Sequence, residues 1–283
     1  MESLINIWQH LPYHIKPYLF SVGSFQLRYY SLMYIVAFAI VYALTRYRIR
    51  NEKYEYSVET LQDAMVWGML AVIIGARLGE VLFYNLNYYL QHPLEIFLPF
   101  SFSNGIHFTG ISGMSYHGGV IGVLIVSWVF MRKRKIDFWR FADLIVPAVP
   151  LGYTFGRLGN FINGELWGRV TAVPWGMYFP LDMTHSLRHP SQLYEAFFEG
   201  IFLFLILWPL RKKSRFDGFL LGLYVVSYGA VRFLIEFFRE PDFMVGPISI
   251  GQTLCSLMMI AGFVMILWRR KVTLSSKHEG AAW

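Results

Sequence analysis

Long apolar runs separated by short polar connections dominate the pattern along this chain. Seven of the runs are candidate membrane-spanning helices: Tyr30–Tyr47, Leu61–Tyr84, His117–Met131, Phe141–Arg157, Gln192–Leu210, Phe219–Phe238 and Ile248–Trp268. Most approach the roughly 20 residues that an α-helix needs to cross the hydrocarbon core, and the third is shorter. The pattern therefore predicts an all-α polytopic membrane protein with about seven transmembrane helices.

Two segments outside these runs are predicted to form structures other than membrane-spanning helices. Residues 1–29 mix aromatic and basic side chains without a long apolar core, so we expect an interfacial segment rather than a cleaved signal peptide. Residues 161–190 contain a β-like patch around 169–179 and are expected to form a small periplasmic cap. We treat residues 1–283 as a single integral membrane domain that includes both segments.

Composition excludes a soluble domain. Of the 283 residues, 55% are hydrophobic and only 15% are charged, a balance typical of membrane proteins. Cys255 is the single cysteine, which excludes an intrachain disulfide framework and a cysteine metal cluster. It lies in an apolar run, and we interpret it as a packing residue. We expect no metal and no other cofactor.

The positive charge follows the predicted spans. The net charge is +7, and 17 of the 25 basic residues fall in four clusters on every second connection. The clusters occupy residues 46–53, 132–140, 211–215 and 269–277. Because cytoplasmic loops are enriched in Lys and Arg, we expect the N-terminus outside and the C-terminus in the cytoplasm. The charge indicates orientation and attraction to an anionic lipid bilayer, and we expect no nucleic-acid partner.

With this orientation, the polar residues of the spans gather toward the outer leaflet. Tyr228, Arg232 and Glu236 recur every four residues and Arg239 follows three later, so they share one face of the sixth span. Charged groups at membrane depth are costly and usually face a cavity or a bundle interior, so they are candidates for function. A structural ion pair between Arg232 and Glu236 and an aromatic-belt role for Tyr228 remain alternatives.

Further polar residues are expected at the same level of the membrane. Tyr30 begins the first span and His117 begins the third, and both positions are also compatible with ordinary interfacial residues. Two glycines follow His117, which permits close helix packing and leaves backbone donors open near the imidazole. Arg77 and Glu80, three residues apart in the second span, favour a structural ion pair.

The segment with the most polar groups is GRLGNFINGELWG, residues 156–168. It combines one arginine, two asparagines and one glutamate with four glycines. Glycines let the backbone approach a ligand or a neighbouring element closely, and Arg157 and Asn160 offer donors suited to phosphate oxygens. A glycine-rich turn with a snorkelling arginine would explain the same pattern without a function. An outer cavity with several arginines and apolar walls would suit a lipid with an anionic head group.

Five segments together resemble one known family. The glycine-rich motif is accompanied by LRYYSLMY at 27–34, SYHGGVIG at 115–122, HPSQLYEA at 189–196 and RFLIEFFREPD at 232–242. This set resembles the bacterial prolipoprotein diacylglyceryl transferases, with every motif position filled. The resemblance implies an inner-membrane enzyme, with its active site toward the periplasmic or outer leaflet. Such an enzyme transfers the diacylglyceryl group from phosphatidylglycerol to the lipobox cysteine of a prolipoprotein, forming a thioether and releasing glycerol phosphate.

The resemblance and this chemistry suggest a role for each candidate. Arg157 and Arg232 are expected to bind the phosphate and stabilise the departing charge. His117 is the candidate general base for a thiol with an ordinary pKa of ~8.5, although the positive field alone is an alternative way to form the thiolate. The catalytic group is thus His117, Arg157, Arg232 and Glu236, and the residues expected to bind substrate are Tyr30, Asn160, Gly168 and Tyr228, together with the two arginines.

A multipass lipid transporter or flippase would use the same cavity without covalent chemistry. Transporters commonly carry paired broken helices in corresponding halves, around a site near the midplane. This chain has one broken polar segment, and it is displaced outward. The pattern therefore favours an enzyme, and a transporter is the alternative.

Overall fold

The computed structural model describes residues 2–22, 25–52, 54–98, 100–101, 107–108, 115–213, 216–241 and 243–280. Two of the clustered basic residues, Lys53 and Arg215, lie outside the described residues. The chain divides into two compact units. The first unit is Met1–Arg48 with Trp139–Trp283, and the second unit is Ile49–Phe138.

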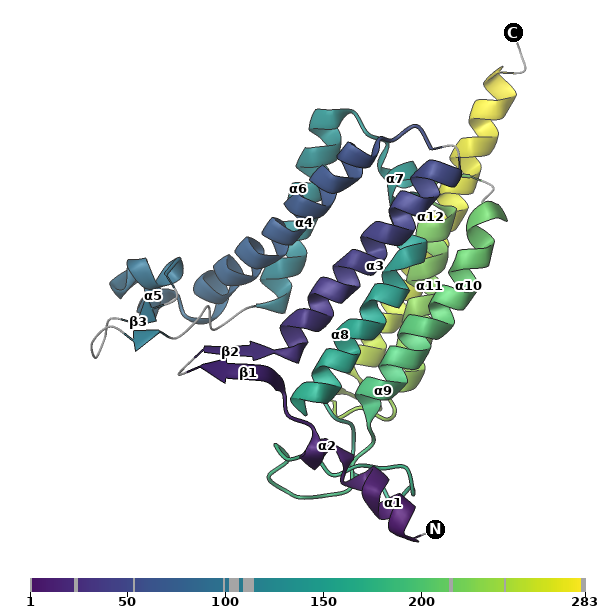
Figure 1. Ribbon diagram of the computed structural model, residues 1–283. Helices are drawn as coiled ribbons and strands as arrows, with labels where there is room; N and C mark the ends of the chain where they lie inside the picture. The colour runs from purple at the N-terminus through teal and green to yellow at the C-terminus, as the bar shows by residue number, and fades with distance from the viewer. Residues whose placement is uncertain are drawn as a thin grey trace. The chain divides into compact units, whose positions relative to one another are not determined.

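The first unit is a bundle of helices (Figure 1). Its N-terminal part comprises α1 (Glu2–Gln9), α2 (Leu11–His14), the hairpin of β1 (Tyr18–Val22) and β2 (Phe25–Arg28), and α3 (Tyr29–Asn51). The remainder comprises α7 (Phe138–Ile145), the 3-10 turn η3 (Val146–Ala148), α8 (Val149–Asn163), α9 (Ser191–Glu195), the π-helical η4 (Ala196–Phe202), α10 (Leu203–Leu210), η5 (Arg211–Lys213), α11 (Phe219–Ile235), the hairpin of β5 (Met244–Val245) and β6 (Ile248–Ser249), and α12 (Ile250–Gly280).

Two prolines break the predicted fourth span. Pro147 and Pro150 stand at the first turns of η3 and α8, where a missing backbone N–H is tolerated. After this break α8 continues to Asn163, beyond the predicted end at Arg157, so the first part of the glycine-rich motif is helical. A Cβ added to Gly152 would lie 2.8 Å from Val41 Cγ2 of α3, so the glycine allows close packing there.

Arg48 and Asp143 fasten the end of the bundle at which α3 ends. Arg48 is fully buried and donates to the carbonyl oxygens of Asp143 and Leu144, at 2.7 and 2.6 Å. The Asp143 carboxylate accepts from the backbone N–H groups of Gly218 and Leu221, at 2.9 and 2.8 Å. Asp143 thus caps the start of α11, a different helix from its own.

Helices occupy all seven predicted spans, and among the described residues four helices are long and apolar enough by themselves to cross a membrane. These are Tyr29–Asn51, Val58–Tyr84, Ser191–Lys213 and Ile250–Ser275, with Phe219–Ile235 a shorter apolar helix. That the remaining helices also cross stays a prediction. The described residues are mostly helical, as predicted, and they also contain three two-stranded antiparallel sheets. Strands of two to five residues give too weak a sequence pattern to be predicted.

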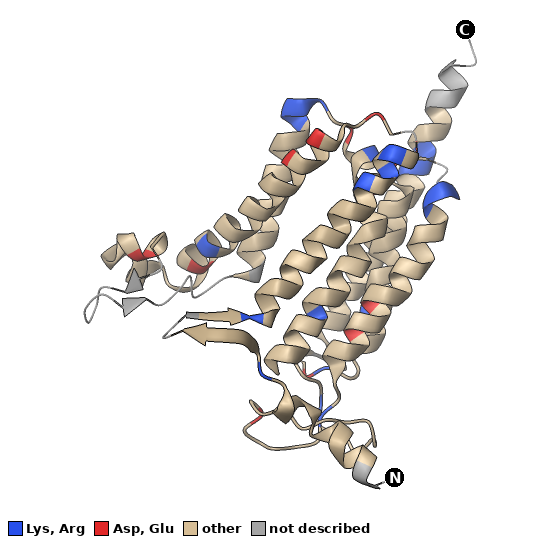
Figure 2. Cartoon of the chain, viewed as in Figure 1, with Lys and Arg blue, Asp and Glu red and all other residues tan. Residues whose placement is uncertain are grey.

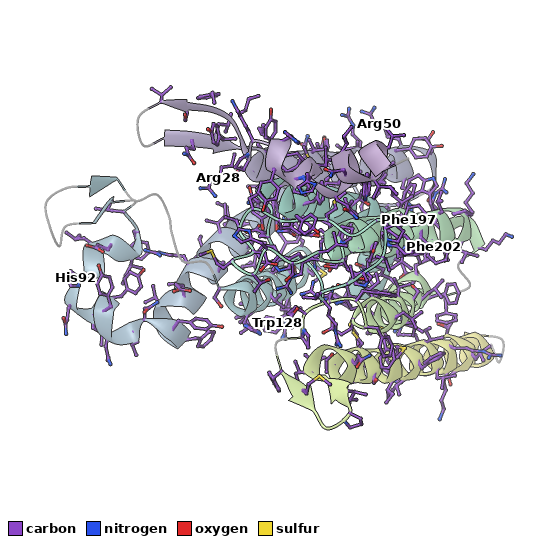
Figure 3. The ribbon with its side chains drawn as sticks, turned by 90° about the horizontal axis from the view of Figure 1, so that it is seen from below. Arg28, Arg50, His92, Trp128, Phe197 and Phe202 are labelled. Carbon is purple, nitrogen blue, oxygen red and sulfur yellow. The ribbon has the colours of Figure 1, made fainter. Side chains whose placement is uncertain are left out.

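The outside of the first unit is apolar between its ends. Phe197 and Phe202, labelled in Figure 3, are 50% and 42% exposed on η4, as expected for side chains that face lipid. Lys and Arg gather at the end of the bundle where α3 and α10 end (Figure 2). This is the end fastened by Arg48.

The second unit is built on two helices that pack through glycines. It contains α4 (Val58–Gly79), the π-helical η1 (Glu80–Tyr84), α5 (Leu86–Gln91), η2 (Pro93–Ile96), β3 (Phe100–Ser101), β4 (His107–Phe108) and α6 (Tyr116–Arg134). Arg77 donates to the carbonyl oxygens of Ile96, at 2.9 Å, and Glu95, while Glu80 accepts from Asn85 at 2.7 Å. Arg77 therefore fastens η2, a role that its spacing from Glu80 did not predict.

Gly118→Ala is expected to destabilise the second unit. A Cβ at Gly118 would lie 2.6 Å from Gly79 Cα and would overlap the Gly75 carbonyl oxygen, so α4 and α6 would have to separate. Overpacking of this kind typically costs about 1–3 kcal/mol. Thermal unfolding of the purified protein in detergent measures the loss. Gly68→Ala on α4 is the control, because no described atom lies within 4 Å of its added Cβ. Equal unfolding temperatures for both variants would contradict the packing argument.

Candidate active site

The end of α8 and the turn that follows it place the polar groups of the glycine-rich motif. Gly164 closes the helix in the left-handed conformation, at φ +69°, and its N–H and that of Glu165 bond to the last carbonyl oxygens of α8. The turn brings Glu165 back onto Asn160, whose Nδ2 donates to Glu165 Oε1 at 2.9 Å. Gln192 of α9 holds the same turn by donating to the Glu165 carbonyl oxygen at 2.6 Å.

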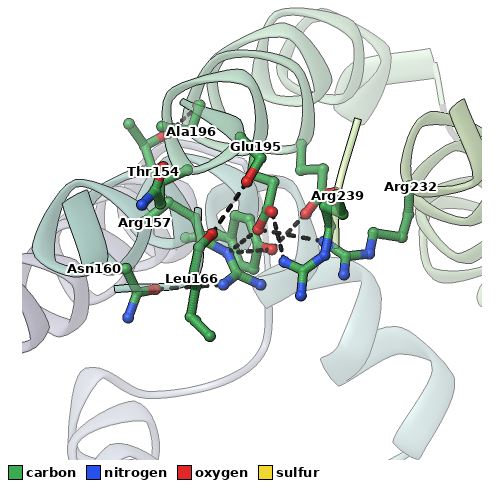
Figure 4. Close-up of polar contacts among 12 residues, drawn as sticks. Thr154, Arg157, Asn160, Leu166, Glu195, Ala196, Arg232 and Arg239 are labelled. Carbon is green, nitrogen blue, oxygen red and sulfur yellow. Dashed lines mark hydrogen bonds and ion pairs between the residues drawn. The ribbon is translucent and has the colours of Figure 1, made fainter. Parts of the chain in front are cut away.

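Three arginines converge on one carboxylate (Figure 4). Glu195 Oε2 lies 2.7 Å from Arg157 Nε and 3.3 Å from Arg232 Nη1. Glu195 Oε1 accepts from Arg239 Nη1 at 2.6 Å. The arginines come from α8, from α11 and from the turn after α11. Residues about 80 positions apart in the sequence therefore meet at a single anion.

Two further carboxylates complete this arginine–glutamate cluster. Arg232 Nη1 donates to Glu199 Oε1 at 3.3 Å, and Arg232 Nη2 lies 3.4 Å from Glu236 Oε2, so the ion pair expected from their spacing is present. Ser249 at the start of α12 donates to Glu236 Oε1 at 3.1 Å. With three arginines and three glutamates, the formal charges of the cluster cancel, whereas sequence reasoning had assigned only Glu236 of the three glutamates to the site.

The arginines and the glutamates of the cluster differ in burial. The side chains of Glu195 and Glu199 are fully buried, whereas those of Arg157, Arg232 and Arg239 each keep 16–18% of their surface exposed. A ligand that reaches the cluster can therefore touch the arginine side chains and not these two carboxylates. Guanidinium groups are planar donors that match the oxygens of a phosphate.

Some buried polar atoms of this cluster have no hydrogen bond. Among the described residues eight such side-chain atoms occur, and three belong to the cluster: Glu195 Oε2, Glu236 Oε2 and Arg239 Nε. Each lies within 4 Å of an opposite charge, at 2.7 Å for Glu195 Oε2 with Arg157 Nε and at 3.6 Å for Glu236 Oε2 with Arg239 Nε. These three atoms are therefore held by ion pairs rather than by hydrogen bonds of good geometry.

Tyr30, Asn160 and Tyr228 surround the arginines. Arg157 Nη1 donates to Asn160 Oδ1 at 3.3 Å, and Tyr30 packs against the neighbouring residue of α8, because a Cβ added to Gly159 would lie 3.1 Å from Tyr30 Cδ2. Arg157 Nε donates to Tyr153 OH at 2.6 Å, and the Tyr153 ring packs edge-to-face on Tyr228. The structure thus brings the predicted residues Tyr30, Asn160 and Tyr228 to the cluster.

Gly168 joins the loop to the turn that carries Arg239. It forms an antiparallel bridge with Arg239, and the next residue, Arg169, donates its N–H to the Phe238 carbonyl oxygen at 2.9 Å. A Cβ at Gly168 would overlap that oxygen and lie 3.0 Å from His189 Cβ. Gly168 was expected to let the loop approach another group closely, and in the structure that group is the backbone at Phe238. The β-like patch after it forms isolated bridges to Arg188 rather than a continuous strand.

His117 belongs to the second unit, whereas the arginine–glutamate cluster belongs to the first. It is exposed near the start of α6, and its Nδ1 lies 3.4 Å from Tyr84 OH. Its role as general base stays a prediction.

The residues that sequence reasoning missed are the central carboxylates. Glu195 and Glu199 were not singled out, nor was Tyr153, which donates to Glu199. The available signal was two glutamates four residues apart in an otherwise apolar span.

A buried ion pair at Asp182 holds the segment predicted as the cap, residues 161–190. Arg188 Nε donates to Asp182 Oδ2 at 2.7 Å, and the Thr184 N–H donates to Oδ1 at 3.1 Å. Burial raises the pKa of Asp182, but the hydrogen bonds from Arg188 and Thr184 outweigh it and lower the pKa from 3.8 to about 2.

This ion pair predicts a specific pH dependence of stability. Because the folded pKa is depressed, the contribution of Asp182 is complete above pH 3.8 and is lost as the pH falls toward 2. Thermal unfolding of wild type and Asp182→Asn measures it. The difference between the two should be constant from about pH 7 to 5 and shrink below about pH 4. A difference that already changes between pH 7 and 5 would contradict the assignment.

Comparison with known proteins identifies the family. The family model described as prolipoprotein diacylglyceryl transferase matches residues 17–268. A phosphatidylglycerol–prolipoprotein diacylglyceryl transferase of Chlorobaculum tepidum is 55% identical over 276 residues, 96% of each chain. Proteins of the same name from Campylobacter hominis and Bordetella avium are 43% identical over 265 residues (92% of each chain) and 44% identical over 256 residues (89% of this chain, 93% of the relative). The chain belongs to the prolipoprotein diacylglyceryl transferase family.

Proposed function

We propose that the arginine–glutamate cluster is the place where this enzyme binds the phosphate of phosphatidylglycerol. As a member of its family the protein is a multi-pass membrane transferase, and it moves the diacylglyceryl group from phosphatidylglycerol to a prolipoprotein. The observation that carries the proposal is the meeting of Arg157, Arg232 and Arg239, whose side chains are partly exposed, at the fully buried carboxylate of Glu195.

The reaction displaces an oxygen by a sulfur at a glyceryl carbon. The thiol of the lipobox cysteine loses its proton, and the thiolate attacks the carbon that bears the phosphate ester. The new carbon–sulfur bond forms as the carbon–oxygen bond breaks, and glycerol phosphate leaves with the electron pair. Arg157 and Arg232 stabilise the charge on this leaving group, Asn160 and Tyr30 position the head group beside them, and His117 is the proposed acceptor of the proton.

A lipid transporter with the same cavity is the competing function. Two assays distinguish a transporter from a transferase. Purified protein in nanodiscs receives phosphatidylglycerol labelled in its acyl chains and a lipobox peptide. The proposal predicts a labelled peptide whose mass has increased by one diacylglyceryl group. One molecule of glycerol phosphate should be released for each peptide modified. In proteoliposomes, movement of labelled lipid across the bilayer without peptide labelling would instead indicate a transporter.

We also propose that the cluster faces the outer leaflet of the bacterial inner membrane. The basic end of the first unit, where α3 and α10 end, supports placing the opposite end outside (Figure 2). Reporter fusions after Arg134 and Lys213 should then read cytoplasmic, while a fusion within the cap should read periplasmic. A cytoplasmic signal from the cap fusion would reverse the proposed orientation of the site.

A further inference from the structure

We propose that Glu195 is a positioning residue for the transfer reaction, which holds the three arginines in the geometry that stabilises the departing phosphate. This inference rests on the proposed function of the cluster. Glu195 does not touch the lipid, because its side chain is fully buried. It acts through Arg157, Arg232 and Arg239.

Among the described residues, Glu195 is the one carboxylate that pairs with all three arginines. Its Oε2 lies between Arg157 and Arg232, and its Oε1 holds Arg239 (Figure 4). Glu199 pairs with Arg232 and accepts from Tyr153, and Glu236 pairs with Arg232 and Arg239. Neither Glu199 nor Glu236 forms an ion pair with Arg157, and Glu199 reaches Arg157 through the Tyr153 hydroxyl. Glu195 is therefore the carboxylate that links the α8 side of the site directly to the α11 side.

Like charges cannot converge without a counter-ion. Three guanidinium groups within reach of one carboxylate repel one another strongly in a medium of low dielectric constant. A buried carboxylate between them offsets this repulsion and fixes each long side chain in one orientation. Without it, the guanidinium groups would keep their charge and lose their common direction.

The backbone around Glu195 is itself fixed against α8. Glu195 ends α9, and the π-helical η4 starts at the next residue. Thr154 of α8 donates to the Ala196 carbonyl oxygen at 3.1 Å, and a Cβ at Gly200 would overlap Thr154 Oγ1. π-helical turns of this kind occur frequently at functional sites. The carboxylate is therefore held at a set distance from Arg157.

Glu195→Gln separates positioning from lipid binding. The amide keeps the shape of the side chain but cannot pair with three cations, so alignment in the transition state is lost. Removing one negative charge also makes the cluster more positive, which favours binding of an anionic lipid. We therefore expect kcat to fall by at least about tenfold while KM for phosphatidylglycerol stays equal or falls. Glu195→Asp keeps the charge and should recover part of the lost kcat.

The measurement is initial-rate kinetics over a phosphatidylglycerol titration in nanodiscs, with the folded yield checked for each variant. Glu240→Gln is the control for loss of a carboxylate, because Glu240 is 60% exposed and pairs with Arg188 of the cap. A folded Glu195→Gln enzyme with wild-type kcat, or with a raised KM as its only defect, would overturn the inference.

Three further outcomes distinguish failure of this inference from other failures. If Glu195→Gln gives no folded protein, Glu195→Asp decides, because its shorter side chain must still lower kcat at constant KM; wild-type kcat in that variant overturns the inference. If Arg157→Lys and Arg232→Lys are defective while Glu195→Gln is normal, only the positioning role fails. If the arginine variants are normal too, the proposed phosphate site itself fails.

Discussion

Arg157→Lys and Arg232→Lys are each expected to lower diacylglyceryl transfer by at least about tenfold, equivalent to ~1.4 kcal/mol of barrier. Arg157 uses Nε and Nη1 at once, toward Glu195, Tyr153 and Asn160. Arg232 uses both terminal nitrogens, toward Glu199 and Glu236. A lysine ammonium is a point charge without this planar fork, so it cannot keep these contacts and also bind a phosphate.

Kinetics distinguish the kind of interaction that is lost. An interaction made mainly in the transition state lowers kcat, whereas one made equally with bound substrate raises KM alone. We expect at least one of the two variants to show the kcat effect in a phosphatidylglycerol titration. Arg77→Lys should be milder, since Arg77 binds carbonyl oxygens of η2 in the second unit. If both site variants keep wild-type kcat and KM, the phosphate site lies elsewhere.

The helices and part of the site could be predicted from local patterns. Apolar runs of about 20 residues specify helices because buried or lipid-facing backbone must satisfy its hydrogen bonds internally. The spacing of four between Arg232 and Glu236 predicts their ion pair, and a helical face is a property of the sequence alone. The break in the fourth span follows in the same way from Pro147 and Pro150.

The convergence on Glu195 could not be predicted in this way. The three arginines reach it across tens of residues of sequence, and a single sequence contains no information about which faces of different helices meet. For that reason sequence reasoning assigned only Glu236 of the three glutamates to the site, whereas the structure adds Glu195 and Glu199. The sequence also placed the end of α8 too early, because glycines disfavour a helix. In the structure Gly159 lies inside α8. A Cβ added there would contact Tyr30 of α3, so the glycine allows the two helices to pack closely.

Gly168→Ala is expected to lower diacylglyceryl transfer on the order of a hundredfold. The added Cβ would overlap the Phe238 carbonyl oxygen, so the bridge between Gly168 and Arg239 must open. The same turn carries Arg239 and follows Glu236, both of which belong to the cluster. A displacement of about 1 Å in a positioned group costs roughly a hundredfold in rate. The lost activity should therefore exceed what the change in unfolding temperature accounts for.

Gly156→Ala is the matched control within the same motif. No described atom lies within 4 Å of a Cβ added at Gly156, and alanine in a helix interior is more stable than glycine by about 1 kcal/mol. This variant should keep wild-type transfer and unfold at an equal or higher temperature. Both proteins are compared at equal folded concentration in nanodiscs. If Gly168→Ala transfers as well as Gly156→Ala, the backbone bridge does not hold the cluster in place; if Gly156→Ala alone is inactive, the open face of α8 beside Arg157 is where substrate lies.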